Sequence, residues 1–364
     1  MRARGVVVAH ADAEALRCDV SEMTPRWARQ TRAREERLSR RRRVSAAAAM
    51  ETEAMDGRAS DAPRGVTASE RVMFAVVAPI FALSFQLSVF FSTDGFRLDR
   101  RQRRTPGFEW AKFMSRVVTG TRLKLVPGSA ALCREKRRTV YLCNHRAWSD
   151  FFLDLYVTEG RAFTMSRLLV AYAFPLFMVP AMVSGTVFGF KRDGGDYEKL
   201  NASLDEHFDK FYDEFTGMVC YPEGTRSIKP QSKPLKRGIL RYAYSRKMAV
   251  QVICTARKER VFSSHLYCAQ RNLALPMYVA EVIQAEDYTD FEDFYNEIRS
   301  KWDDAWYEAN RVNEKEVESL PDYVPRERVV ACTNRHDVLS ASSALCAVLG
   351  VALAWRATSR FWDY

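Results

Sequence analysis

The chain has 364 residues, of which 47% are hydrophobic, and a formal net charge of +11. This length is ample for one or two domains with a sizeable core, which excludes a chain too small to fold. The positive charge predicts an anionic partner, either a membrane surface or a nucleic acid.

The first fifty residues form a basic arm with twelve arginines against six acidic residues. We interpret residues 1–68 as a disordered, solvated arm. A transit peptide is the competing interpretation, and the acidic residues argue against it. Arg40 to Arg43 can contact anionic lipid head groups. They could equally bind nucleic acid, but neither interleaved aromatic residues nor zinc-finger spacing supports that.

The first long apolar run extends from Val72 to Thr93, carries no charge and is interrupted only by Pro79 and Gln86. It is long enough to cross a bilayer core of ~30 Å. We predict that residues 69–110 are a membrane anchor with a basic flank, either one full span or a hairpin broken at Pro79. More arginines follow the run than precede it, which places the rest of the chain on the cytoplasmic side.

A short strand is predicted at Thr139–Cys143, followed by a turn and a helix opened by Ser149 and Asp150. Residues five apart on a regular helix point about 140° apart. His145 must therefore precede the helix and fold back over its first turn. Asp150 can then accept a hydrogen bond from one imidazole nitrogen and leave the other free as a general base.

A second apolar stretch, Leu168 to Phe190, has the composition of a membrane span but contains Pro175 and Pro180. A single crossing here would separate His145 from the polar loop at residues 222–227, and one site needs both. We therefore predict a helix and a strand buried in the catalytic domain, partly against the membrane surface.

Two segments, 200–215 and 291–306, have apolar residues at helical spacing, and both are expected to cover the core. His207 lies beside the first stripe and is interpreted as a packed histidine. Further strands are predicted at Met248–Cys254 and Pro276–Gln284. Strands that alternate with helices predict an α/β layered domain over residues 111–330, with a central sheet flanked by helices.

Another apolar strand, Val219 to Tyr221, leads into Pro222-Glu-Gly-Thr-Arg-Ser227. An acid, a flexible glycine, a hydroxyl and a guanidinium thus follow a strand end, where sheet proteins commonly display functional groups. The guanidinium of Arg226 can bind a phosphate through two parallel hydrogen bonds.

Val338 to Trp355 form an uncharged run in the segment 331–364, which we predict to be membrane-associated as a second span or an interfacial helix. The eight cysteines show neither close pairing nor zinc spacing, so reduced thiols are expected. Cys143 and Cys220 adjoin the two polar loops and are interpreted as buried strand residues.

The two motifs, Asn144-His-x-x-x-x-Asp150 and Pro222-Glu-Gly-Thr-Arg226, resemble those of the glycerolipid acyltransferase family, which includes the 1-acylglycerol-3-phosphate acyltransferases. The resemblance covers roughly residues 115–260. A third family block corresponds to Gly185–Arg192, where Arg192 is the favoured match and Lys191 the alternative. A fourth block, a Val-Pro pair on a strand, is matched only by Ala249–Ile253, with Gln251 in place of proline.

The resemblance implies transfer of an acyl group from acyl-CoA to the free hydroxyl of lysophosphatidic acid, giving phosphatidic acid. Glycerol-3-phosphate or another lysophospholipid is the alternative acceptor. His145 would be the general base and Asp150 its partner. Asn144 or a backbone N–H near Ser149 would stabilise the oxyanion. We expect neither a metal nor a prosthetic group, with acyl-CoA as a co-substrate.

The implied phosphate clamp is Arg226, assisted by Arg192 and Lys191. Glu223, Gly224 and Thr225 would either bind the substrate or anchor their loop. We expect the chain in the endoplasmic reticulum membrane with its catalytic domain facing the cytoplasm, in preference to a plastid or mitochondrial membrane, and no nucleic-acid partner. The alternative of another class is a catalytically silent membrane-binding protein that kept the fold.

Overall fold

The computed structural model describes residues 65–92, 102–103, 105–173, 175–191, 197–326 and 330–331. The predictions for the basic arm up to residue 64, for Arg192 and for the run Val338–Trp355 lie outside the described residues. All described helices and strands lie in one compact unit, residues 66–364.

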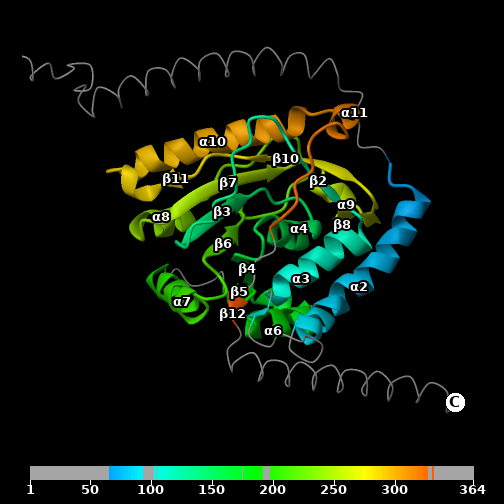
Figure 1. The fold of residues 1–364 in the computed structure, drawn as a ribbon, viewed down its shortest axis with the longest axis horizontal. Coiled ribbons are helices and arrows are strands. Elements are labelled where there is room, and N and C mark those ends of the chain that lie inside the picture. The colour runs from blue at the N-terminus through cyan, green and yellow to red at the C-terminus, as the bar shows by residue number, and fades with distance from the viewer. Residues whose placement is uncertain are drawn as a thin grey trace, which may run out of the picture. The chain divides into compact units, whose positions relative to one another are not determined.

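A mixed sheet lies at the centre of the fold (Figure 1), with eight described strands in the order β2–β10–β7–β3–β6–β4–β5 and β11 paired to β7. Its strands are β2 (Arg122–Leu125), β3 (Thr139–Cys143), β4 (Ala162–Arg167), β5 (Val187–Phe190), β6 (Gly217–Cys220), β7 (Ala249–Thr255), β10 (Ala274–Val279) and β11 (Ile283–Gln284). Strand β3 runs parallel to both β6 and β7. The carboxyl ends of β7, β3 and β6 therefore meet at one edge of the sheet.

Helices cover both faces of this sheet, as its alternating side chains require. On β3, Tyr141 and Cys143 enter one hydrophobic cluster, whereas Val140 and Leu142 enter the other. The first cluster packs against α2 (Ala68–Ser92), α3 (Pro106–Lys112), α4 (Ser149–Val157) and α6 (Pro175–Val183). The second packs against α7 (Tyr197–Lys210), α8 (Arg237–Ser245) and α10 (Phe291–Arg311). The predicted α/β layered fold is confirmed.

Shorter elements complete the described chain. They are the π-helix η3 (Phe113–Val118), the helices α5 (Leu169–Ala173), α9 (Lys258–Val261) and α11 (Glu314–Val317), the 3₁₀ turn η4 (Ala285–Asp287), and the strand pairs β1 (Gln102–Arg103) with β12 (Val330–Ala331) and β8 (Phe262–Ser263) with β9 (Cys268–Ala269).

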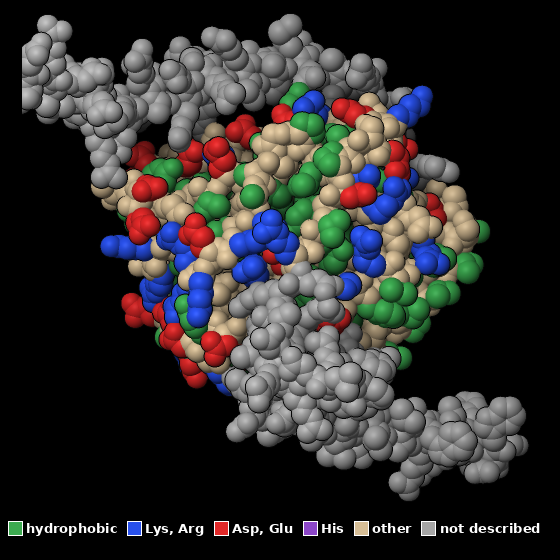
Figure 2. Space-filling model, viewed as in Figure 1, with side chains coloured by type: hydrophobic (Ala, Val, Ile, Leu, Met, Phe, Trp, Pro, Cys, Tyr) green, Lys and Arg blue, Asp and Glu red, His purple; other side chains and the backbone are tan. Residues whose placement is uncertain are grey.

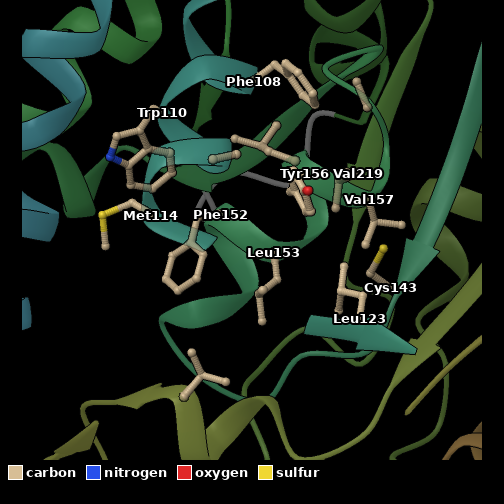
Figure 3. Close-up of a cluster of buried hydrophobic side chains, with 14 of the residues drawn as sticks. Phe108, Trp110, Met114, Leu123, Cys143, Phe152, Leu153, Tyr156, Val157 and Val219 are labelled. Carbon is tan, nitrogen blue, oxygen red and sulfur yellow. The ribbon is translucent and has the colours of Figure 1, made fainter. Parts of the chain in front are cut away.

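Aromatic side chains pack α2 and α3 against the sheet-facing helix α4. Figure 3 shows Trp110 of α3 and Phe152 of α4 in this cluster. The Trp110 ring is fully buried, with its centre 5.5 Å from that of Phe81 and 6.2 Å from that of Phe152. Its indole Nε1 donates a hydrogen bond of 2.9 Å to the hydroxyl of Ser84 on α2. A buried indole N–H normally needs such a partner, so this bond fixes where α2 lies on the domain.

Helix α2 is the predicted apolar segment, and it continues through Pro79. The hairpin alternative is therefore wrong. Ala68–Phe85 is long and apolar enough to cross a membrane by length and composition. One side of the helix is nevertheless packed on the domain through Phe81 and Phe85, whereas Val72, Val76 and Leu83 on the other side are exposed.

The second apolar stretch folds as predicted into helix and strand, namely α5, α6 and β5. His207 on α7 is packed, as expected. Its Nε2 lies 3.1 Å from the Gly185 carbonyl oxygen, and its ring centre lies 4.4 Å from that of Phe163.

Candidate active site

Three polar segments come together at the carboxyl ends of β7, β3 and β6. His145 follows β3, the loop Tyr221–Ser227 follows β6, and Lys258 lies three residues beyond β7. Because these three strands are adjacent and parallel, their ends are neighbours. This is the edge at which open α/β sheets bind ligands.

The imidazole of His145 and the carboxylate of Asp150 form the hydrogen bond that the sequence predicts, with 2.7 Å between Nδ1 and Oδ2. The same Oδ2 accepts hydrogen bonds from the backbone N–H groups of Arg146 (2.6 Å) and Ala147 (3.0 Å). The ring stacks on Tyr221, with 4.2 Å between ring centres. Within the described part of the chain, Nε2 of His145 has no hydrogen-bond partner, which leaves it available as a base.

Helix α4 begins at Ser149, as predicted, but no side chain caps its first turn. The Ser149 hydroxyl donates instead to the Lys258 carbonyl oxygen at 2.7 Å. Asp150 likewise binds N–H groups of the loop that precedes the helix, because its carboxylate turns back towards His145.

The two motif loops are joined directly. The His145 N–H donates to Oε2 of Glu223 at 3.0 Å, and the Ser227 N–H donates to the His145 carbonyl oxygen at 3.0 Å. The other oxygen of Glu223 accepts from the Lys233 N–H at 3.1 Å. Both oxygens of this buried carboxylate thus bind backbone groups, and these contacts are those of a loop anchor.

Gly224 and Thr225 shape the same loop. Gly224 has a φ of +73°, in the left-handed region that favours glycine. Thr225 is exposed, and its hydroxyl oxygen accepts a hydrogen bond from the Lys233 ammonium at 2.8 Å.

The candidate phosphate ligand Arg226 is half-buried, and its Nη1 donates to the Ser264 hydroxyl at 2.9 Å. Burial lowers the pKa of Arg226, against the negative charge of Asp150, which raises it. An arginine remains charged under these conditions. Lys191 is exposed just beyond β5. Its part in the clamp remains a prediction.

Asn144 is not available to an oxyanion, contrary to one of the two predictions. Its Nδ2 donates to the Thr255 carbonyl oxygen at 2.9 Å, and its Oδ1 accepts from the Thr255 N–H at 3.0 Å. The side chain is buried and fastens the end of β3 to the end of β7. Only the backbone N–H alternative remains from the sequence.

Gln251 occupies the strand position at which the resemblance leads us to expect proline. Its amide is fully buried and links three backbone groups. Oε1 accepts from the Cys133 N–H at 2.8 Å, and Nε2 donates to the carbonyl oxygens of Ala131 (2.8 Å) and Ala280 (2.9 Å). The side chain thereby holds the segment before β3 against β7.

Sequence reasoning missed two buried charged residues, Asp154 and Lys258. The Lys258 ammonium lies 3.0 Å from Asp154 and 3.4 Å from Asp150. Burial raises the pKa of Asp150, but Lys258 and the hydrogen bond from His145 outweigh burial and lower it. Burial dominates at Asp154 and raises its pKa to about 7. The spacing of Asp150 and Asp154 places them on one side of α4 and was a usable signal, whereas Lys258 lies in a charged run typical of surfaces.

A third overlooked residue, Arg146, organises the loop after the second motif. Its guanidinium pairs with Glu259 at 2.9 Å and donates to the carbonyl oxygens of Lys229 (2.7 Å) and Ile228 (3.2 Å). One buried arginine thus holds the chain that follows Arg226 close to the His145 loop.

The described cysteines are free and buried. Burial raises the pKa of Cys220 to about 12 and raises that of Cys143 well above its ordinary value. A thiol nucleophile must ionise, so neither cysteine is suited to that role.

Comparison with known proteins assigns this arrangement of groups to a family. The Acyltransferase family model matches residues 126–256, a segment that contains His145, Asp150, Glu223 and Arg226. Residues 126–256 belong to the acyltransferase family. None of the curated proteins matches the chain.

Among solved structures, the chain is similar to the 1-acyl-sn-glycerophosphate (LPA) acyltransferase PlsC from Thermotoga maritima. That match has 12% sequence identity and a TM-score of 0.48, and it covers 67% of this chain and 96% of that chain. The segment matched by the family model ends before Lys258, and α2, α3 and α10 also lie outside it.

The raised pKa of Asp154 predicts a pH-dependent stability. Its pKa is about 7 in the folded protein against an ordinary value of 3.8, so between these values the folded state binds more protons. The resulting stabilisation is complete below about pH 4 and is lost as the pH rises to about 7. Relative to Asp154→Asn, the unchanged protein should lose unfolding free energy over this range, measured by urea denaturation. The exposed Asp303→Asn serves as control, and its unfolding free energy should depend on pH as that of the unchanged protein does. A difference in unfolding free energy between Asp154→Asn and the unchanged protein that stays constant with pH would contradict the assignment.

Proposed function

We propose that this acyltransferase transfers a fatty acyl group from an acyl-CoA thioester to the free hydroxyl of lysophosphatidic acid or a related lysophospholipid. The observation that carries the proposal is the His145–Asp150 pair, with Nδ1 bonded at 2.7 Å and Nε2 without a partner among the described residues. Arg226 supplies a fixed positive charge on the adjoining loop, where the N–H of the next residue, Ser227, binds the His145 carbonyl oxygen.

The geometry supports direct transfer. Nε2 of His145 removes the proton from the acceptor hydroxyl as its oxygen attacks the thioester carbonyl carbon, and Asp150 stabilises the imidazolium that forms. Collapse of the tetrahedral intermediate breaks the C–S bond, and the imidazolium returns its proton to the CoA thiolate. The products are the esterified phospholipid and free CoA. Glu223 contributes by holding the two loops in register through the His145 N–H.

The acceptor phosphate is assigned to Arg226. Its guanidinium is half-buried and is held by the Ser264 hydroxyl, so little side-chain freedom remains to be lost on binding. Partial burial also strengthens a charge-assisted hydrogen bond to phosphate compared with one in water.

The acceptor is a lipid, and the exposed side of α2 offers a membrane contact. Val72, Val76 and Leu83 are exposed by 65%, 51% and 50%. Figure 2 shows hydrophobic side chains gathered over α2. Because the opposite side of α2 is packed on the domain, we place α2 in the membrane interface, with its outward side chains in the acyl-chain region of one leaflet.

His145→Ala should lower kcat for acyl transfer by about 10²–10⁴-fold, since it removes the general base. The measurement is release of free CoA together with the identity of the product, using a panel of phosphate-bearing and phosphate-free acceptors. The exposed His265 provides the control variant His265→Ala, which should retain activity. Retained turnover in a pure, folded His145→Ala protein would remove this residue from the mechanism, and an inactive unchanged protein across the whole panel would refute the proposed function.

Arg226→Ala should raise KM for a phosphate-bearing acceptor by at least about tenfold, because one charge-assisted hydrogen bond is lost. It should change KM for acyl-CoA much less. Lysine at this position should rescue only part of the loss because it cannot bind bidentately. Arg122→Ala, at a surface ion pair on β2, is the matched control. An equal effect on both substrates would show that the phosphate is bound elsewhere.

The double variant Val76→Asp with Leu83→Asp should weaken binding to anionic phospholipid vesicles by about tenfold or more, since it replaces two apolar insertions by charges. Vesicle co-sedimentation measures this effect. Val324, which is 66% exposed outside α2, gives the control Val324→Asp. Unchanged sedimentation of the double variant would mean that another surface contacts the membrane.

A further inference from the structure

Lys258 is a fully buried lysine whose ammonium group is surrounded by oxygen atoms. Nζ donates to the Asn144 carbonyl oxygen at 2.7 Å and to both oxygens of Asp154 at 3.1 and 3.0 Å. It also lies 3.4 Å from Oδ1 of Asp150. A buried charge is costly unless it is paired, and here two carboxylates and one carbonyl share a single cation.

The two oxygens of Asp150 differ in their surroundings. Oδ2 accepts three hydrogen bonds, from His145 and from two backbone N–H groups. Oδ1 is buried and accepts no hydrogen bond from the described residues; its charged neighbour is Lys258. A proton added to Asp150 would therefore reside on Oδ1, beside an ammonium ion that repels it.

The backbone explains how a residue beyond β7 reaches this position. Arg257 has a φ of 63°, in the left-handed region, and turns the chain at the start of α9. Ser149 then bonds to the Lys258 carbonyl oxygen at 2.7 Å, so the main chain of Lys258 is attached to the first turn of α4. Its side chain contacts the end of β3 and, through Asp150 and Asp154, the first two turns of that helix.

The other ionisable groups around the pair cannot replace this cation. Arg146 is neutralised by Glu259 at 2.9 Å, and both oxygens of Glu223 bind backbone N–H groups. Burial raises the pKa values of Cys143 and Tyr221 well above their ordinary values, which keeps both neutral. Arg226 acts on Asp150 electrostatically and is assigned to substrate. Because its pKa is about 7, Asp154 is mostly protonated and neutral at acidic pH.

We propose that Lys258 is a positioning residue of this active site: its ammonium group keeps Asp150 ionised and oriented so that Oδ2 accepts the bond from His145 Nδ1. The inference rests on the proposed function, in which His145 is the base. Lys258 touches no reacting atom and acts through Asp150. Without it, a carboxyl group buried beside a second carboxyl group takes up a proton more readily, and the imidazole loses its anionic partner.

The test is the pH profile of kcat/KM for Lys258→Met. Its acid limb should move to higher pH by about one unit or more, the usual effect of losing an opposite charge at this distance. At a pH on that limb, kcat/KM should fall about tenfold or more, whereas KM changes little. A second readout needs no substrate: in histidine-labelled protein, the downfield NMR signal of the Nδ1–H bonded to Asp150 should weaken or shift.

Two further variants separate positioning from folding. Lys124→Met removes another buried lysine, which pairs with Asp322 at 3.0 Å on β2; it should lower stability but leave the acid limb and the NMR signal in place. Lys258→Met combined with Asp154→Asn removes both charges of the buried pair, so it should regain stability while its acid limb stays at higher pH.

An unmoved acid limb and an intact Nδ1–H signal in the folded single or double variant would overturn the inference. A double variant that regains stability and also the original pH profile of kcat/KM would overturn it too. Neither result bears on whether the unchanged protein transfers acyl groups. Conversely, if the unchanged protein is inactive, the proposed function fails, and the NMR signal alone still decides whether Lys258 supports the His145–Asp150 bond.

Discussion

The carboxylate of Asp150 is the group on which the active site depends, because one oxygen accepts three hydrogen bonds and sets the path of the loop before α4. Those bonds turn the imidazole of His145 back over the helix. They also place the His145 backbone where Glu223 and Ser227 can bind it from the neighbouring loop. A single buried anion thus specifies both the orientation of the His145 imidazole and the contact between two distant segments.

The parallel arrangement of β7, β3 and β6 makes that contact possible. Each strand delivers one component to the same edge: the Lys258 ammonium after β7, the His145 imidazole after β3, and a loop with Glu223 and Arg226 after β6. The helices on both faces leave this edge as the place where chemistry can occur. Helix α2 is constrained on one side only, because Trp110 holds that side on the domain while Val72, Val76 and Leu83 face outwards.

Sequence patterns predicted most of the fold and the two motif loops because hydrophobic periodicity and strand-end polar residues are local signals. The bond between His145 and Asp150 followed from their five-residue spacing together with the predicted strand, turn and helix. The role of Asn144 could not be predicted, since its partner Thr255 lies 111 positions further along the chain. Lys258 was missed for the same reason. It lies between the charged residues Arg257 and Glu259, a pattern typical of surface segments, and only the turn at Arg257 directs it inwards.

Gln251 limits which residues this strand position can accept. A proline side chain offers neither donor nor acceptor, so a chain with proline here must hold the segment around Ala131 and Cys133 by other means. Exchange of Gln251 for proline would remove three hydrogen bonds to backbone groups, two of them buried. The segment before β3 and the chain after β10 would then need other contacts to stay against β7.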